Sequence, residues 1–202
     1  MINGTSEFVN QLAIAITTVV FNRSALLFAG EDGVAAVSII MYLQFLCIGI
    51  YFGFSMGLST PLGYAYGDRN FSVCRVLEQY AYRFFAIAPI ILYGCTYLLA
   101  PIGVRFFASP GSTVFDMAVS GLRLYGLGFL FSGINIFAAI RMMTYGKGYI
   151  SGMITFLRSF ALLLLFLTVL PRFLELNGIW LAVPAAEILT LIVALWTLRK
   201  KL

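Results

Sequence analysis

The chain has 202 residues, of which 61% are hydrophobic and 10% are charged, and its mean hydropathy is +0.98. Soluble domains usually carry about 25% charged residues. This composition therefore excludes an ordinary soluble domain and indicates an all-α membrane protein. The 13 Lys and Arg residues exceed the 8 Asp and Glu residues. They lie at the ends of apolar runs, which favours lipid headgroups over nucleic acid as their partners.

Histidine is missing from the sequence, which excludes Ser-His-Asp and Cys-His nucleophile systems and His-ligated zinc. The three cysteines, Cys47, Cys74 and Cys95, have no C-x-x-C spacing. They are interpreted as small buried hydrophobic residues rather than as ligands of a metal or partners in a disulfide. The sequence therefore predicts no enzyme activity and no cofactor.

The apolar runs predict a bundle of six transmembrane helices in a single membrane domain, residues 1–202. A helix needs about 20 apolar residues to cross the hydrocarbon core of a bilayer. The second run is unusually long, and we expect its helix to break near Pro61, whose ring removes an amide donor. The predicted spans are roughly residues 8–29, 34–60, 76–100, 115–140, 152–170 and 178–198.

Polar, Gly- or Pro-containing clusters separate these runs and predict turns. They lie at residues 30–33, 67–70, 109–112, 145–148 and 175–178. Trp180, just after the last cluster, is expected to anchor its helix at the membrane interface.

The basic residues predict the orientation of the bundle, because cytoplasmic loops carry an excess of Lys and Arg. One side has nine of them, whereas the other has four. The nine are Arg69, Arg75, Arg83, Arg141, Lys147, Arg158, Arg199, Lys200 and Lys201, and the four are Arg23, Arg105, Arg123 and Arg172. Both termini are therefore expected in the cytoplasm, and the protein in the plasma membrane.

Gly49, Gly53 and Gly57 recur every four residues in the second span. Small residues at this spacing form a stripe along one helix face, which lets another helix approach closely in lipid. We expect this stripe to pack against a helix.

Charged residues inside a span are rare and usually face a partner or a water-filled cavity. Glu187 lies midway along the sixth span, three residues after Pro184. Two interpretations remain open: a carboxylate that holds a coupling cation, or an ion pair with Arg158 at a compatible depth in the antiparallel fifth span. Glu7 opens the first span, where a carboxylate stabilises the positive end of a helix, so capping and a functional role are both open for it.

Other polar and aromatic residues of the spans are candidates for lining a cavity, although packing between helices accounts for such residues equally well. These candidates are Asn22, Tyr42, Gln44 and Phe45.

Several runs of residues, taken in order, resemble the C-terminal half of the multidrug and toxic compound extrusion (MATE) family. Residues 3–8, 30–36 and 57–64 with Tyr66, Gly67 and Asn70 resemble its seventh and eighth helices. Leu157, Arg158, Leu170, Pro171 and residues 177–182 with Pro184 and Glu187 resemble its eleventh and twelfth. The third and fourth spans match the family in pattern only.

The resemblance implies one six-helix lobe of a twelve-helix antiporter, in which Na⁺ or H⁺ drives export of an organic substrate. The partner of this lobe would be an N-terminal six-helix lobe in the same or another chain, or the sequence is a fragment. Some family members place cation-site carboxylates in the seventh and tenth helices, and the corresponding candidates here are Glu7 and Asn135.

The predicted function is a cation-coupled antiporter half that exports organic cations or amphipathic drugs. One alternative is a lipid-linked saccharide flippase of the same superfamily, for which several Arg and Lys residues should line the cavity. Another is a membrane scaffold that transports nothing.

Overall fold

A computed structural model of the chain describes the backbone of residues 2–199 and the side chains of residue 13 and residues 15–199. All regular structure in this part of the chain is helical, including one 3₁₀ segment, η1, and one π-helical segment, η2. The elements in chain order are α1 Ile2–Gly67, α2 Phe71–Arg105, α3 Thr113–Tyr125, η1 Gly126–Gly128, α4 Phe129–Thr144, α5 Gly148–Phe156, η2 Leu157–Ala161, α6 Leu162–Val169 and α7 Pro171–Arg199.

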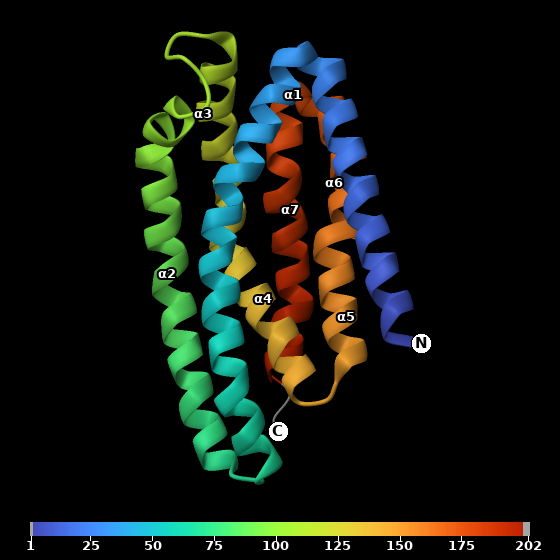
Figure 1. Cartoon of the computed structure of the whole chain (residues 1–202), viewed down its shortest axis with the longest axis vertical. Coiled ribbons are helices and arrows are strands. Elements are labelled where there is room, and N and C mark those ends of the chain that lie inside the picture. Colours follow the sequence, from blue (N-terminus) through green and yellow to red (C-terminus); the bar gives the residue numbers. More distant parts are fainter. Residues whose placement is uncertain (1, 200–202) are drawn as a thin grey trace.

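The first helix, α1, consists of two arms that fold back on each other at Gly30 (Figure 1). Gly30 has φ 61° and ψ −153°, a conformation that few residues other than glycine adopt. At Gly33 a Cβ atom would lie 2.6 Å from the Cβ of Ala29, so the turn requires glycine there as well. The second arm runs through Pro61 to Gly67, so the expected break near Pro61 is absent.

A second reversal, at Glu175, joins α6 to the long part of α7. Glu175 has φ 51° and ψ −130°. A Cβ on Gly178 would lie 2.5 Å from the carbonyl oxygen of Leu170, so the returning helix passes against the end of the preceding one. Two of the remaining turns begin helices with side-chain caps: Asn70 accepts from the amide of Val73 at the start of α2, and Ser112 from that of Phe115 at the start of α3.

Five helical stretches of the described chain are long and apolar enough to cross a membrane. They are Ala15–Gly67, Phe71–Arg105, Thr113–Thr144, Gly148–Val169 and Pro171–Arg199. The first contains the Gly30 turn. The predicted all-helical membrane fold is therefore what the structure shows, whereas the count of six spans stays a prediction.

The centre of the bundle is formed by α3, α4 and α7. In the most apolar window of Thr113–Thr144, 67% of the residues are buried, and for Pro171–Arg199 the share is 56%. The same share is only 28% for the first stretch, 17% for α2 and 11% for Gly148–Val169. These outer helices therefore present most of their surface to whatever surrounds the bundle.

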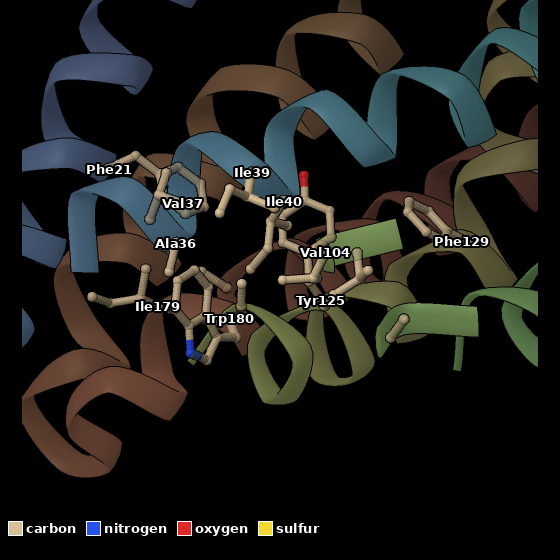
Figure 2. Close-up of a cluster of buried hydrophobic side chains, with 14 of the residues drawn as sticks. Phe21, Ala36, Val37, Ile39, Ile40, Val104, Tyr125, Phe129, Ile179 and Trp180 are labelled. Carbon is tan, nitrogen blue, oxygen red and sulfur yellow. The ribbon is translucent and has the colours of Figure 1, made fainter. Parts of the chain in front are cut away.

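Trp180 lies in the largest cluster of buried side chains, next to Ile40 and Ile179 (Figure 2). Its side chain is 1% exposed, so the expected anchoring at the membrane interface is wrong. The reason is Gly121 of α3, where a Cβ atom would lie 2.8 Å from Trp180 Cε2. The glycine leaves room for the indole in the core.

Candidate functional site

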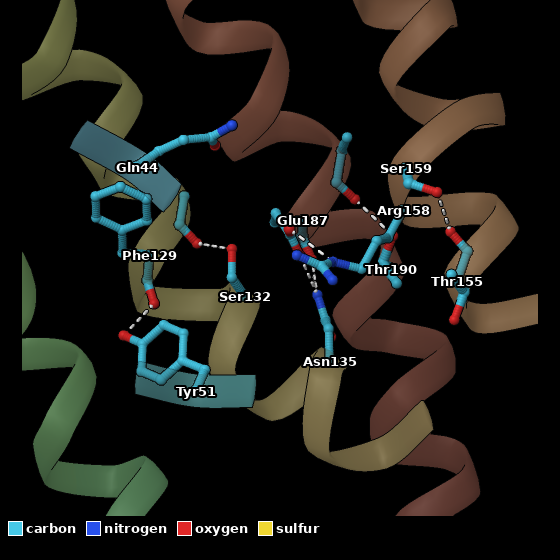
Figure 3. A network of polar contacts seen from close by, with 12 residues as sticks. Gln44, Tyr51, Phe129, Ser132, Asn135, Thr155, Arg158, Ser159, Glu187 and Thr190 are labelled. Carbon is cyan, nitrogen blue, oxygen red and sulfur yellow. Dashed lines mark hydrogen bonds and ion pairs between the residues drawn. The ribbon is translucent and has the colours of Figure 1, made fainter. Parts of the chain in front are cut away.

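Glu187 of α7 is the centre of a buried polar site (Figure 3). Its side chain is 5% exposed, and its Oε1 lies 2.9 Å from Nε of Arg158. Its other oxygen, Oε2, accepts a hydrogen bond of 2.7 Å from Nδ2 of Asn135. The structure thus forms the ion pair that the sequence left open for Glu187 and Arg158, and it adds Asn135, so the site joins α4, η2 and α7.

Arg158 lies in the π-helical segment η2 between α5 and α6. Such segments are rare and often occur at functional sites. The hydroxyl of Thr17, on the first arm of α1, donates to the carbonyl oxygens of Ala13 (2.8 Å) and Ser159 (3.5 Å). The first arm of α1 therefore lies against the segment that carries Arg158.

Close contact between η1 and α7 brings α4 to the site. A Cβ on Gly128 would lie 3.2 Å from Val183 Cγ1 and 3.4 Å from the backbone nitrogen of Pro184. Asn135 follows Gly128 by about two helical turns, and its Nδ2 also bonds the backbone carbonyl of Glu187 at 2.9 Å. The close approach at Gly128 and the hydrogen bonds of the Asn135 amide thus hold α4 against α7 at the depth of the Glu187 carboxylate.

The oxygen Oδ1 of Asn135 is buried and has no hydrogen-bond partner. Buried polar atoms are rarely left without one. Because the amide nitrogen is held by two oxygens of Glu187, the amide orientation is set and Oδ1 points away from the carboxylate. This oxygen is therefore available to a ligand or a proton donor.

The four cavity-lining candidates do not converge on Glu187. Tyr42 and Phe45 are 66% and 77% exposed on the second arm of α1, where the Tyr42 ring stacks on Phe107 at 6.0 Å between centroids. Gln44 accepts a hydrogen bond from the hydroxyl of Tyr125. Asn22 lines an open pocket of about 600 Å³ at the turn of α1, together with Arg23 and Glu31.

The glycine stripe of Gly49, Gly53 and Gly57 packs against nothing in the described part of the chain. All three residues are exposed, and a Cβ atom built on any of them would meet no atom within 4 Å. The stripe therefore lies on an open face of α1. The side chain of Glu7 lies outside the described residues, so its environment stays undefined.

The structure holds a second buried ionic network that the sequence reasoning missed. Arg141 of α4 pairs through Nε with Glu78 of α2, and the hydroxyl of Tyr145 donates to the same carboxylate oxygen at 2.6 Å. Arg141 NH1 reaches the carbonyl of Thr197 at 3.5 Å. Burial and the hydrogen bond to Glu78 raise the pKa of Tyr145 above its ordinary value. The sequence signal that could have revealed this network is Glu78, an acidic residue within an apolar run.

Within the described residues, no group of three or more His, Cys, Asp or Glu side chains could hold a metal ion.

The fold and the two buried ion pairs define a polytopic helical membrane protein with charges inside its bundle, an arrangement typical of secondary transporters. Residues 8–170 match the MatE family, and the chain belongs to this multidrug and toxic compound extrusion family. No match was found among curated proteins.

Solved structures of transporters have the same fold. An outward-facing multidrug resistance MATE family transporter of the MOP superfamily is 23% identical, with a TM-score of 0.85 over 96% of this chain. An inward-facing MATE family transporter is 22% identical, with a TM-score of 0.87 over 96% of this chain. A MOP superfamily transporter from Pyrococcus furiosus, described as having a binding pocket of reverse polarity, is 22% identical, with a TM-score of 0.85 over 96% of the chain.

This chain covers only 44%, 45% and 44% of the length of those three structures. It therefore spans less than half of the transporters that it matches.

Proposed function

We propose that the chain is the C-terminal lobe of a MATE-type antiporter in the plasma membrane, with both termini in the cytoplasm. The whole transporter exports organic cations or amphipathic compounds by alternating access. The observation that carries the proposal is the buried Glu187, whose charge is balanced by Arg158 inside a bundle of membrane-length helices. Family membership and the common fold support a transporter.

Glu187 supplies the competition that antiport needs. A coupling cation and a substrate cation that both neutralise one carboxylate exclude each other, so binding of one releases the other. Arg158 occupies the carboxylate when neither is bound. The site is then electrically balanced in its resting state, and an empty carrier does not have to hold an unpaired charge in the membrane.

We propose H⁺ rather than Na⁺ as the coupling ion. Both oxygens of Glu187 accept from N–H groups, and Asn135 Oδ1 is the free oxygen at the site. A metal cation prefers a shell of several oxygens, and a Na⁺ about 4 Å from the Arg158 guanidinium is opposed by about 4 kcal/mol at an effective dielectric of about 20. A proton, by contrast, needs only one oxygen of the Glu187 carboxylate and no further oxygen ligands.

The partner of the lobe is a second six-helix lobe in the same or another chain. The chain covers under half of the solved transporters, and the open face of α1 carries Gly49, Gly53 and Gly57 without a neighbour. Small residues on such a face allow close approach of another helix in lipid. Glu7 and Asn135 remain candidate coupling residues of the assembled protein.

A flippase for lipid-linked saccharides needs several basic side chains free to bind phosphate. The two arginines deepest in the described bundle, Arg141 and Arg158, each pair with a carboxylate instead. The charge balance of the described residues therefore favours the antiporter.

The test uses the complete transporter in proteoliposomes, with a fluorescent lipophilic cation as the substrate. A pH gradient should drive its movement, whereas a Na⁺ gradient at constant pH should not. Glu187→Gln should abolish the response to the pH gradient, while Glu175→Gln, which changes an exposed carboxylate at the reversal within α7, should keep it. Undiminished movement in Glu187→Gln would exclude this site from coupling, and dependence on Na⁺ alone would exclude the proton.

A further inference from the structure

A narrow apolar groove lies between the second arm of α1 and the end of α2, on the outside of the bundle and apart from the Glu187 site. Its volume is about 300 Å³, and its walls include Leu43 and Leu46 of α1, Leu99 of α2 and Phe106, which directly follows α2. The lining residues on this second wall extend from Cys95 to Phe106. Leu46, Leu99 and Phe106 are 68%, 53% and 82% exposed, so the groove is open along its outer side.

The dimensions of the groove match one hydrocarbon chain. At a rise of 1.5 Å per residue, the wall formed by residues 95–106 is about 16 Å long. The whole hydrocarbon core of a bilayer is about 30 Å thick. The groove therefore extends over about one leaflet. A volume of about 300 Å³ spread over this length is a slender space, of the kind that one hydrocarbon chain occupies.

One end of the groove carries a positive charge. Arg105 lies in the last turn of α2, directly before the lining residue Phe106, and is exposed. Among the described residues it forms no ion pair. The neighbouring Arg123 is engaged differently, because its Nε donates to the carbonyl of Tyr97 at 3.2 Å and its guanidinium lies 4.8 Å from the Tyr97 ring centroid. Arg105 is therefore the cation available at this end.

We propose that this groove binds a phospholipid, with one acyl chain along α2 and an anionic headgroup at Arg105. The apolar walls exclude a polar ligand, and the length and width select a single chain that ends at the membrane interface. The charge at that end complements a lipid phosphate with a net negative headgroup. The proposal is independent of transport and of the Glu187 site.

The groove also explains how the lipid holds two helices together. Gly103 of α2 lies close to Leu43 of α1, because a Cβ atom on Gly103 would be 3.4 Å from a Leu43 methyl group. The sulfur atom of Cys47 lies 3.7 Å from the hydroxyl oxygen of Thr96. These contacts form the floor between α1 and α2. An acyl chain above them fills the space that the two helices leave open.

The test is native mass spectrometry of the intact protein, titrated with phosphatidylglycerol and phosphatidylcholine that carry the same acyl chains. The wild type should retain one phosphatidylglycerol in preference to phosphatidylcholine. Arg105→Gln should lower the retention of phosphatidylglycerol about fivefold, which is the contribution of one surface arginine to anionic lipid binding, and leave that of phosphatidylcholine unchanged. Arg172→Gln, an exposed arginine of α7, is the matched control and should behave as the wild type.

Two variants fill the groove from its opposite walls. Leu99→Trp and Leu46→Trp place a larger ring at exposed positions and should reduce retention of both lipids, while size-exclusion elution stays unchanged. A variant with a filled groove that binds lipid as the wild type does would overturn the proposal. So would an Arg105→Gln protein that keeps the preference for phosphatidylglycerol, or a wild type that has none.

Discussion

Asn135 donates to Glu187 twice, with Nδ2 2.7 Å from the carboxylate oxygen Oε2 and 2.9 Å from the backbone carbonyl. One side chain of α4 therefore holds both the charge and the backbone of α7. Because the amide is wholly buried, water does not replace these bonds when the side chain is removed. Asn135 is thus a structural clamp as well as a candidate for coupling.

Asn135→Ala should lower stability by about 1–3 kcal/mol, since it leaves the buried carboxylate oxygen Oε2 of Glu187 without its amide donor. The measurement is the melting temperature of the purified protein, followed by tryptophan fluorescence. Asn177→Ala, at an exposed position just after the reversal within α7, should change it little. Equal melting temperatures for the two variants would contradict the clamp.

The pair of Arg158 and Glu187 should show strong thermodynamic coupling. Glu187→Gln and Arg158→Gln each leave a buried charge without its partner, and each should cost about 3–5 kcal/mol. The double variant should cost clearly less than the sum, because neither charge remains. Melting temperatures and membrane protein levels of the four proteins measure this. Additive losses would show that the two side chains act independently.

Gly53 and Gly133 should respond differently to a larger side chain. A Cβ on Gly53 meets nothing within 4 Å, whereas one on Gly133 would lie 2.8 Å from Phe85 Cδ1. We expect Gly53→Leu to leave the lobe folded and to block its association with the second lobe, and Gly133→Leu to unfold the lobe itself. Melting temperature measures folding, and transport by the complete protein measures association. Normal transport in Gly53→Leu would remove this face from the interface.

The stability that the Glu78 network provides should depend more on the charge of Glu78 than on the hydroxyl of Tyr145. Glu78→Gln leaves Arg141 uncompensated and should cost about 3–5 kcal/mol, whereas Tyr145→Phe removes one hydrogen bond and should cost about 0.5–1.5 kcal/mol. The ranking of the two melting temperatures checks this. A larger loss in Tyr145→Phe would show that the hydroxyl dominates.

The same network predicts a pH dependence at alkaline pH. The pKa of Tyr145 is raised in the folded protein by burial and by Glu78. The stabilisation that follows is complete below the unfolded pKa of about 10 and is lost as pH rises above it. The stability of the wild type should therefore fall more steeply than that of Tyr145→Phe above pH of about 10, in melting curves recorded from pH 8 to 11. If the stability of the two proteins fell in parallel with pH, the raised pKa of Tyr145 would be contradicted.

Lys147 should face the cytoplasm. Its loop joins α4 and α5, and the basic residues at this end of the bundle outnumber those at the other. A single cysteine at position 147 in a Cys-free protein should react with an impermeant maleimide in inverted vesicles only. Reaction in intact cells would reverse the proposed orientation.

The turns and the depth of the charged residues could be predicted from the sequence, because both depend on local patterns. Gly30 stands in a polar cluster and adopts the positive φ that its residue type permits. Counting residues from the ends of antiparallel spans places Arg158 and Glu187 at compatible depths, and in the structure they are in contact.

Other features depend on packing between distant elements and could not be predicted. Trp180 is buried because Gly121, 59 positions earlier in the sequence, makes room for it. The π-helical segment around Arg158 has the same apolar composition as an α-helix, so periodicity gives no sign of it. The pair of Glu78 and Arg141 escapes prediction because Arg141 follows the predicted span of residues 115–140, whereas α4 carries that arginine into the bundle, where it is 2% exposed.

The spacing of the two ion pairs along the chain bears on how the protein enters the membrane during synthesis. Arg158 and Glu187 are 29 residues apart and belong to consecutive helical stretches, so they can leave the ribosome and insert as one hairpin with balanced charges. Glu78 and Arg141 are 63 residues apart. At about 5–20 residues per second, the carboxylate of α2 waits about 3–13 s for its arginine. During that interval Glu78 lacks the arginine that compensates it in the folded bundle, so the complete burial of this part of α2 has to wait for α4.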